Sequence, residues 1–237
     1  MSMKIVIDPH YQHNAPFIAQ LPRLFDEGQV ELIYAKRNQV GRVSHQGEAM
    51  IVKRFKRVNM VQRVVYSFFR KTKAERAYLF AEEYRRRGIM TPRRVAYMER
   101  RQWGLFTVGY FVSAEAQGTE CHLLLREVKD FDVKLADAVA AQVVLMHSRG
   151  VLHGDLNLSN FLCTADSDGY HFTMIDINRS KFTTGMPSDN ACLKNLVRLT
   201  HRRDLYDYLV RSYARQRGWD EDATAVTALQ LLNKFEH

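Results

Sequence analysis

The spacing of apolar residues changes once along the 237-residue chain, after the small and polar stretch Ala114–Gly118. Before this point, apolar and β-branched residues mostly alternate, as in strands, and two segments have helical spacing instead. The predicted strands lie within Val30–Phe55, Arg94–Glu99 and Leu105–Ser113, and the predicted helices are Val58–Phe69 and Thr72–Arg87. Beyond Gly118, helical spacing dominates. The sequence therefore predicts an α+β protein of two lobes: residues 1–114 with a small antiparallel sheet, and residues 115–237, which are mainly helical.

The second lobe is predicted to contain a central helix and a helical C-terminal region. Asp132 is a suitable N-cap for a helix whose apolar face includes Val139 and Val143 and which ends at Gly150. Apolar residues recur at helical spacing in the region Ala191–His237, which predicts further helices there.

The charge and cysteine content narrow the possible partners and compartments. There are 35 Lys and Arg residues against 26 Asp and Glu, giving a net charge of +9 and a pI near 9.5, which favours nucleotides, nucleic acid or an anionic lipid surface as partners. Three widely spaced cysteines indicate neither a disulfide framework nor a zinc site. No apolar run is long enough for a transmembrane helix, and the N-terminal sequence lacks the order of a signal peptide. We therefore expect a cytoplasmic protein.

The segment Val151–Phe182 interrupts the helical region and carries most of the chemistry. It reads VLHGDLNLSNFLCTADSDGYHFTMIDINRSKF, in which a loop with Asp155 and, five positions later, Asn160 precedes two short strands. The turn Asp166–Gly169 joins these strands, and the second strand ends at Asp176. This order predicts that three polar side chains lie at one edge of a hairpin.

These residue types suit phosphoryl transfer. A carboxylate can orient an acceptor hydroxyl and take its proton, whereas hard oxygen ligands hold the magnesium ions that bridge the phosphates of ATP. Asp155 fits the role of catalytic base, and Asn160 with Asp176 fits the role of magnesium ligands. Their spacing matches the protein-kinase pattern H-R-D-x-x-x-x-N followed by D-F-G, here H-G-D-L-N-L-S-N followed by D-I-N.

A nucleotide-anchoring pair is predicted in the first lobe. The third predicted strand ends in M-I-V-K with Lys53, which matches the kinase strand V-A-I-K. In that pattern the lysine contacts the α- and β-phosphates and pairs with a helix glutamate. Glu75 is the first acidic residue after Lys53 and is the predicted partner, while Glu82 and Glu83 stay open as alternatives for another helix register.

With these motifs the chain resembles the lipopolysaccharide core kinases, the heptose and Kdo kinases of the protein-kinase-like superfamily. The resemblance covers about Val30 to Arg203 and is carried by V-L-H-G-D-L-N-L-S-N-F-L, M-I-D-I-N-R, V-K-R-F and K-A-E-R…R-G-I-M-T-P-R-R-V-A-Y. It implies a two-lobed protein-kinase-like fold and transfer of the γ-phosphate of ATP to a sugar hydroxyl of lipid A-core, an anionic glycolipid. It also implies a cytoplasmic enzyme acting at the inner face of the inner membrane. The residue roles that it implies are the base Asp155, the magnesium ligands Asn160 and Asp176, and the pair Lys53 and Glu75.

Several positions differ from the protein-kinase pattern. Gly154 stands where many protein kinases have the arginine that receives an activation-loop phosphate, so activation by phosphorylation is not expected. Asn157 stands where many have a lysine, so transition-state charge would be met by this amide or by a nearby cation. The motifs A-P-E and G-x-G-x-x-G are absent, which argues against a peptide-substrate platform and requires a different phosphate-covering loop.

A strongly basic region follows the predicted anchoring strand. The segment Lys53–Lys73 holds eight Lys or Arg residues and no acidic residue, around an apolar stripe from Val61 to Phe69. Such a helix is typical of a membrane-surface element, although a helix packed on the first lobe with a solvated basic face explains the same pattern. Arginines elsewhere, among them Arg198, Arg202 and Arg203, suit bidentate binding of an anionic sugar-phosphate acceptor, and surface solubility explains some of them.

Other functions stay open at this point. A small atypical protein kinase or a phosphotransferase for small molecules would use the same Asp155, Asn160 and Asp176. A nucleic-acid-binding module would explain the charge, and a nucleotide-binding scaffold would explain the fold, but neither explains why base and metal ligands occur together. Nucleic acid is therefore not the expected partner. Each polar residue alone is also a typical turn or cap residue, and only their order and spacing favour a kinase.

Overall fold

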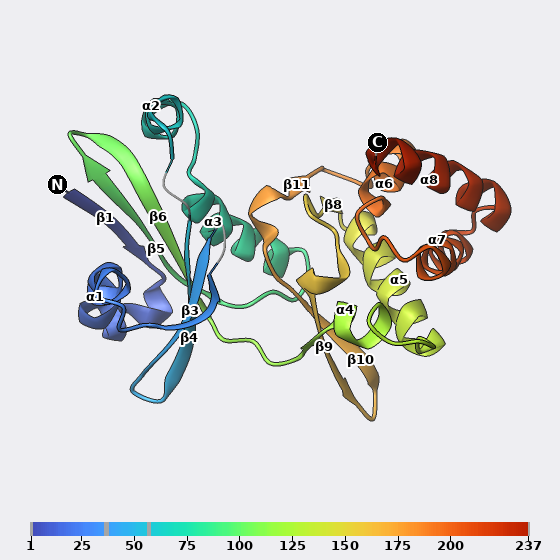
Figure 1. Ribbon diagram of the computed structural model, residues 1–237, viewed down its shortest axis with the longest axis horizontal. Helices are drawn as coiled ribbons and strands as arrows, with labels where there is room; N and C mark the ends of the chain where they lie inside the picture. The colour runs from blue at the N-terminus through green and yellow to red at the C-terminus, as the bar shows by residue number, and fades with distance from the viewer. Residues whose placement is uncertain (1, 36–37, 56–57, 237) are drawn as a thin grey trace. The chain divides into compact units, whose positions relative to one another are not determined.

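The computed structural model describes residues 2–35, 38–55 and 58–236, which form two compact units (Figure 1). The first unit comprises Met1–Glu83 and Pro92–Glu115, and the second comprises Tyr84–Thr91 and Ala116–His237. The segment Tyr84–Thr91 belongs to the second unit because it is hydrogen-bonded there. The hydroxyl oxygens of Tyr84 and Ser180 are 2.7 Å apart, and Thr91 donates to the carbonyl of Met174 at 2.8 Å. The division expected from the sequence counts this segment in the first lobe.

The first unit is built on a six-stranded antiparallel sheet with the strand order β1-β5-β6-β4-β3-β2. The strands are β1 Ser2–Ile7, β2 Glu31–Ala35, β3 Gln39–His45, β4 Glu48–Arg54, β5 Arg94–Gln102 and β6 Leu105–Ala114. The predicted strands are confirmed, whereas β1 is an element that the apolar pattern did not reveal. Strand β4 lies inside the sheet, where Lys53 is opposite Val40 of β3 and Phe111 of β6.

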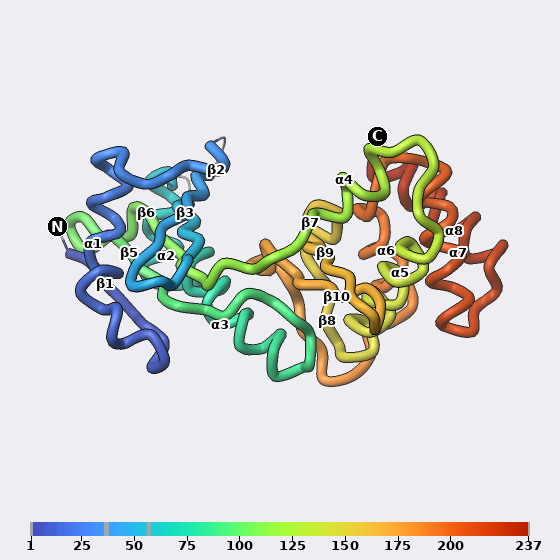
Figure 2. Tube along the Cα trace, turned by 90° about the horizontal axis from the view of Figure 1, so that it is seen from below, coloured from blue at the N-terminus to red at the C-terminus, as the bar shows by residue number. Residues whose placement is uncertain are grey.

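Helices cover both faces of this sheet. The first unit contains η1 (Pro9–Asn14), α1 (Ala15–Asp26), α2 (Met60–Phe68) and most of α3 (Lys73–Arg86). Leu21 of α1 shares a core with Met98 of β5, whereas Tyr78 of α3 packs in a second cluster with Tyr97, the preceding residue of β5. Since successive strand residues point to opposite faces, α1 and α3 cover opposite faces of the sheet (Figures 1 and 2). Both predicted helices of this half, α2 and α3, are confirmed.

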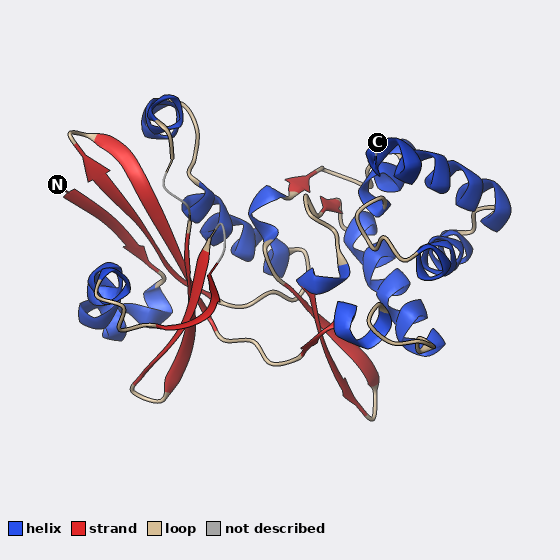
Figure 3. Ribbon diagram, viewed as in Figure 1, coloured by secondary structure: helices blue, strands red, loops and turns tan. Residues whose placement is uncertain are grey.

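The second unit is mainly helical and contains one short hairpin (Figure 3). Its helices are α4 Cys121–Leu125, α5 Val133–Ser148, α6 Asp189–Leu196, α7 Arg203–Arg217 and α8 Glu221–Glu236, with short η2 Leu158–Asn160 and η3 Ile177–Arg179. Its strands are β7 Thr119–Glu120, β8 Val151–Leu152, β9 Phe161–Asp166, β10 Gly169–Met174 and β11 Lys181–Phe182. Asp132 caps α5 as predicted, accepting hydrogen bonds from the backbone N–H groups of Lys134 and Leu135 at 2.8 and 3.2 Å.

The predicted α+β class, with an antiparallel sheet followed by a mainly helical part, is confirmed. No helix among the described residues is long and apolar enough to cross a membrane.

Candidate active site

The loop after β8 is organised by a buried histidine. Nε2 of His153 donates to the carbonyl of Ile175 at 3.0 Å, and Nδ1 accepts the backbone N–H of Asp155 at 3.1 Å. Burial lowers the pKa of His153 below its usual value, which keeps the ring neutral and suits this pattern of one donor and one acceptor. His153 therefore joins the loop of Asp155 to the end of β10.

Asn160 makes a second connection between the same segments. Its side-chain amide nitrogen donates to the backbone carbonyl of Asp155 at 2.7 Å. Its backbone carbonyl accepts the N–H of Ile175 at 3.0 Å. The side chain is buried, so this geometry fixes which way the amide faces. Because the side-chain nitrogen is hydrogen-bonded to the backbone, the side-chain oxygen is the atom left for a ligand.

Asp176 follows directly after this connection. Its backbone is left-handed, with φ 54° and ψ 40°, a conformation that aspartate adopts more readily than most residues. The amide of Asn178 donates to one of its carboxylate oxygens at 2.6 Å. The structure thus brings Asp155, Asn160 and Asp176 together at one end of the β9–β10 hairpin, as the sequence predicts.

Two arginines flank the carboxylate of Asp155. Nη1 of Arg198 lies 3.4 Å from Oδ1, and Nη1 of Arg179 lies 4.0 Å from Oδ2. Of the C-terminal arginines considered for an anionic acceptor, Arg198 is the one beside the loop. Arg202 instead donates to the carbonyl of Lys129, and Arg203 pairs with a carboxylate of α8. Arg179 was missed, although its position three residues after Asp176 is a signal that the sequence offers.

Steric crowding explains why position 154 is glycine. A Cβ at this position would lie 2.2 Å from the carbonyl oxygen of Arg179 and 2.5 Å from its Cβ. No side chain fits there unless the segment after Asp176 moves. The departure from the kinase arginine at this position is therefore required by the packing of two loop segments.

A buried hydrogen-bond chain supports the loop from behind. Asn195 of α6 donates to the carbonyl of His153 at 2.7 Å and lies 3.1 Å from Nε2 of His147. Nδ1 of His147 is 2.8 Å from the hydroxyl of Tyr213, to which Arg217 donates at 2.6 Å. Burial lowers the pKa of His147 to about 4, so its ring is neutral and can accept from Tyr213 while donating to Asn195. The apolar spacing that predicts α5 does not reveal these hydrogen-bond partners.

The first unit contains the predicted nucleotide-anchoring residues. The ammonium group of Lys53 lies 5.7 Å from the centroid of the Phe55 ring. Glu75 is in the first turn of α3, where its N–H donates to the hydroxyl of Thr72 at 3.1 Å. Of the alternative partners, Glu82 pairs with Arg94 at 3.5 Å. The pairing of Lys53 with Glu75 stays a prediction.

The donor set fits magnesium better than a protein-only metal site. Within the described ranges, no group of three His, Cys, Asp or Glu side chains is placed to hold a metal. Asn160 and Asp176 offer one amide oxygen and one carboxylate, and magnesium typically takes one or two protein ligands and completes its shell with phosphates and water.

Comparison with known proteins identifies the family. The model of the lipopolysaccharide kinase (Kdo/WaaP) family matches residues 35–221, which is most of the chain. The chain belongs to this family. It is therefore an ATP-dependent kinase of the lipopolysaccharide kinase class, as the motifs indicate. No curated protein matches the sequence.

Solved structures add information on the fold. The structure "WaaP in complex with acyl carrier protein" has a TM-score of 0.64 at 18% identity and covers 99% of this chain and 100% of that chain, which supports the protein-kinase-like fold. The Rio2 kinase from Chaetomium thermophilum, solved with ADP, Mg2+ and phosphoaspartate, gives a TM-score of 0.46 at 15% identity over 84% of this chain and 60% of that one. WbdD with a kinase inhibitor gives 0.48 at 16% identity over 85% and 44%. These last two overlaps are too weak to support an argument.

Proposed function

We propose that this kinase transfers the γ-phosphate of ATP to a sugar hydroxyl, on heptose or Kdo, of the lipopolysaccharide inner core. The observation that carries the proposal is the set of hydrogen bonds made by His153 and Asn160. These bonds hold a carboxylate, an amide oxygen and a second carboxylate at one end of the β9–β10 hairpin. That is the arrangement required for a base next to two hard metal ligands.

Each residue has a role in this reaction. Asp155 orients the acceptor hydroxyl and takes its proton, since its carboxylate is partly exposed and its backbone is fixed on both sides. Asn160 and Asp176 would hold magnesium, which would supply positive charge against the ATP phosphates. Lys53 anchors the α- and β-phosphates, and Glu75 orients Lys53.

Arg179 and Arg198 extend this scheme to the acceptor. Both guanidinium groups lie beside Asp155 and are partly exposed, so they can bind phosphate or carboxylate groups on the acceptor sugar. They also supply positive charge beside Asp155, in a motif that has Asn157 in place of lysine. An anionic core sugar fits this setting better than a neutral metabolite does.

The acceptor and the location belong to the same proposal. The net charge of +9 supports action at an anionic membrane surface, on the cytoplasmic face of the inner membrane. The chain from Asp176 to the start of α6 at Asp189 is short, which leaves little room for a peptide platform. These features support a glycolipid acceptor over a protein.

The test is transfer from γ-labelled ATP with magnesium to a lipopolysaccharide fraction, with protein and small-sugar fractions beside it. We expect label in the glycolipid with the wild type and with Asp168→Ala, an exposed turn carboxylate that serves as a matched control. Asp155→Ala is expected to bind ATP but to transfer no label. Label only in protein or small sugars would refute the acceptor class, and an active Asp155→Ala variant would refute the base.

A further inference from the structure

Helix α2 has no buried residue among its nine. Met60, Val61, Val64 and Phe68 of the helix and Phe69 at its C-cap are exposed, and Phe69 is 81% exposed. Solvated helices normally present polar side chains, and an amphipathic helix normally buries its apolar face against the core. Tyr66 of this helix packs edge-on against Phe106 of β6, with 5.8 Å between the ring centroids, whereas the apolar side chains of Met60, Val61, Val64 and Phe68 stay exposed in the described chain.

A second exposed apolar residue lies at the turn between β5 and β6. Trp103 is 90% exposed, and its φ of 56° places it in the left-handed region, which glycine and asparagine adopt far more readily. Gly104 follows with φ 77°, so the two residues form the tight turn of the hairpin. Neither packing nor turn geometry explains a tryptophan at this position.

Helix α2 is attached to this hairpin. Arg63 donates to the carbonyls of Phe106 and Gln102 at 3.3 and 3.5 Å, and Ser67 accepts the N–H of Phe106 at 2.8 Å. These contacts place α2 and the turn of Trp103 at the same end of the first unit. We call the exposed apolar side chains of Met60, Val61, Val64, Phe68, Phe69 and Trp103 the apolar patch.

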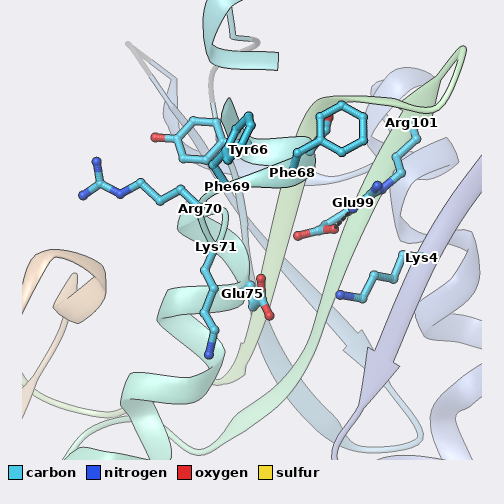
Figure 4. Close-up of a pocket in the computed structure, with 10 residues that line it drawn as sticks. Lys4, Tyr66, Phe68, Phe69, Arg70, Lys71, Glu75, Glu99 and Arg101 are labelled. Carbon is cyan, nitrogen blue, oxygen red and sulfur yellow. Dashed lines mark hydrogen bonds and ion pairs between the residues drawn. The ribbon is translucent and has the colours of Figure 1, made fainter. Parts of the chain in front are cut away.

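Positive charge borders the apolar patch. Arg70 and Lys71 follow Phe69 and, together with Lys4 and Arg101, line a pocket of about 280 Å³ that Phe68 and Phe69 also line (Figure 4). The pocket also contains two carboxylates. Glu99 is buried and already bound to Thr72 at 2.8 Å and to Arg101 at 3.2 Å, and Glu75 lies on α3.

The uncompensated charge beside the patch is cationic. No ion pair in the described part of the chain joins Arg63, Arg70 or Lys71 to a carboxylate. The sequence has no acidic residue between Glu48 and Glu75. Lys56 and Arg57, which belong to the same basic region, lie outside the described residues.

We propose that the apolar patch, with Arg70 and Lys71, binds the surface of an anionic phospholipid bilayer. Phe68, Phe69 and Trp103 enter the boundary between headgroups and acyl chains, where aromatic rings are favoured. The two cations bind lipid phosphates. Phe68 and Phe69 line the pocket together with the two cations, whereas Met60, Val61, Val64 and Trp103 lie outside it and are exposed. Exposed apolar side chains bordered by cations suit an anionic lipid surface.

This proposal rests on the proposed function only in that it would bring the enzyme to a lipid-linked acceptor. Binding itself requires no turnover. Flotation with vesicles therefore tests membrane binding, and label transfer to a soluble fragment of core sugar tests the proposed reaction. A negative result in one assay does not imply a negative result in the other.

The experiment is flotation of the full chain with vesicles of mixed phosphatidylcholine and phosphatidylglycerol, compared with phosphatidylcholine alone. The variant Phe69→Ser, Trp103→Ser, Arg70→Gln, Lys71→Gln changes only exposed side chains. Each cation near an anionic leaflet is worth about fivefold in binding, so with the aromatic residues we expect a loss of about 100-fold. Val226→Ser with Lys234→Gln removes one exposed apolar side chain and one exposed cation of α8; it is the control and is expected to float like the wild type.

A spectroscopic readout locates the contact. The chain has two tryptophans, so Trp219→Phe leaves Trp103 as the only indole. We expect its emission to shift to shorter wavelength with anionic vesicles and to stay unchanged with neutral ones. A wild type that does not float, a variant that floats equally well, or a Trp103 emission that ignores the vesicles would each overturn the proposal. If the variant instead loses binding to an acidic protein while no form floats, the patch is a protein interface and the lipid proposal is wrong.

Discussion

His147 makes the stability of the second unit sensitive to mild acid. A histidine in the unfolded chain has a pKa of 6.5, whereas burial lowers the pKa of His147 in the fold to about 4. Between these two values the unfolded chain binds a proton that the folded protein does not bind. The free energy of unfolding therefore falls as the pH drops below 6.5 and continues to fall until the folded protein also binds the proton, near pH 4.

The size of the effect follows from these two pKa values. At about pH 5 nearly all unfolded chains carry the proton and only about a tenth of folded molecules do, so His147 alone lowers the free energy of unfolding by about 2 kcal/mol relative to about pH 7.5. This is a large share of the roughly 5–15 kcal/mol that stabilises a typical domain. Burial gives the main structural reason, because it disfavours the charged ring, and the positive charge of Arg217 lowers the pKa of His147 further.

The test compares urea unfolding at these two pH values for the wild type and for His147→Gln, which cannot titrate. The fluorescence of Trp219 in a Trp103→Phe background reports on the network, since the rings of Trp219 and Tyr213 are 5.7 Å apart. We expect the acid-induced loss of unfolding free energy to be smaller by about 2 kcal/mol in His147→Gln. His10→Gln, which removes an exposed histidine of the first unit, should leave the loss unchanged. Equal losses in the wild type and His147→Gln would refute the reasoning.

Three further predictions concern the loop and its supports. Gly154→Ala forces a Cβ to within 2.2 Å of the Arg179 carbonyl, so we expect a loss of most phosphoryl transfer together with about 1–3 kcal/mol of unfolding free energy, and a stable, active variant would contradict this. Arg198→Gln removes a cation beside the predicted base, so in steady-state kinetics the KM for an anionic acceptor should rise about tenfold while kcat changes less. The control is Arg203→Gln, because Arg203 pairs with a carboxylate of α8. Asp132→Ala removes the N-cap of α5 and should lower the free energy of unfolding by about 1 kcal/mol, seen as a lower urea midpoint. Activity at neutral pH should be retained.

The elements that the sequence predicted correctly are those whose periodicity is regular. Strands β2 to β6 are short runs rich in apolar residues, and α3 and α5 carry apolar stripes with a cap or a glycine stop. Helix α1 is hard to predict because Pro22 lies inside it, and proline is disfavoured in the interior of a helix. In the fold this proline is buried beside Leu21 and Phe25, so packing against the sheet compensates for the hydrogen bond that proline cannot make. A single-sequence pattern does not contain that compensation.

The candidate site divides in the same way. Asp155, Asn160 and Asp176 lie in one continuous segment, so fixed spacing and a short hairpin suffice to bring them together. Asn195 of α6 contacts this loop, and Tyr213 of α7 contacts His147 of α5, only because these helices pack together, which no local pattern reveals.

Gly154 connects these two kinds of information. In the sequence, glycine in place of arginine means only that a cation is missing next to the predicted base. In the fold, the missing side chain allows the backbone of Arg179 to approach, and this approach places the guanidinium of Arg179 at 4.0 Å from Asp155. The segment after Asp176 therefore supplies the cation that the loop lacks. Because backbone contact with Gly154 positions this segment, no phosphate is needed to order it, and we expect the purified, unphosphorylated enzyme to be fully active.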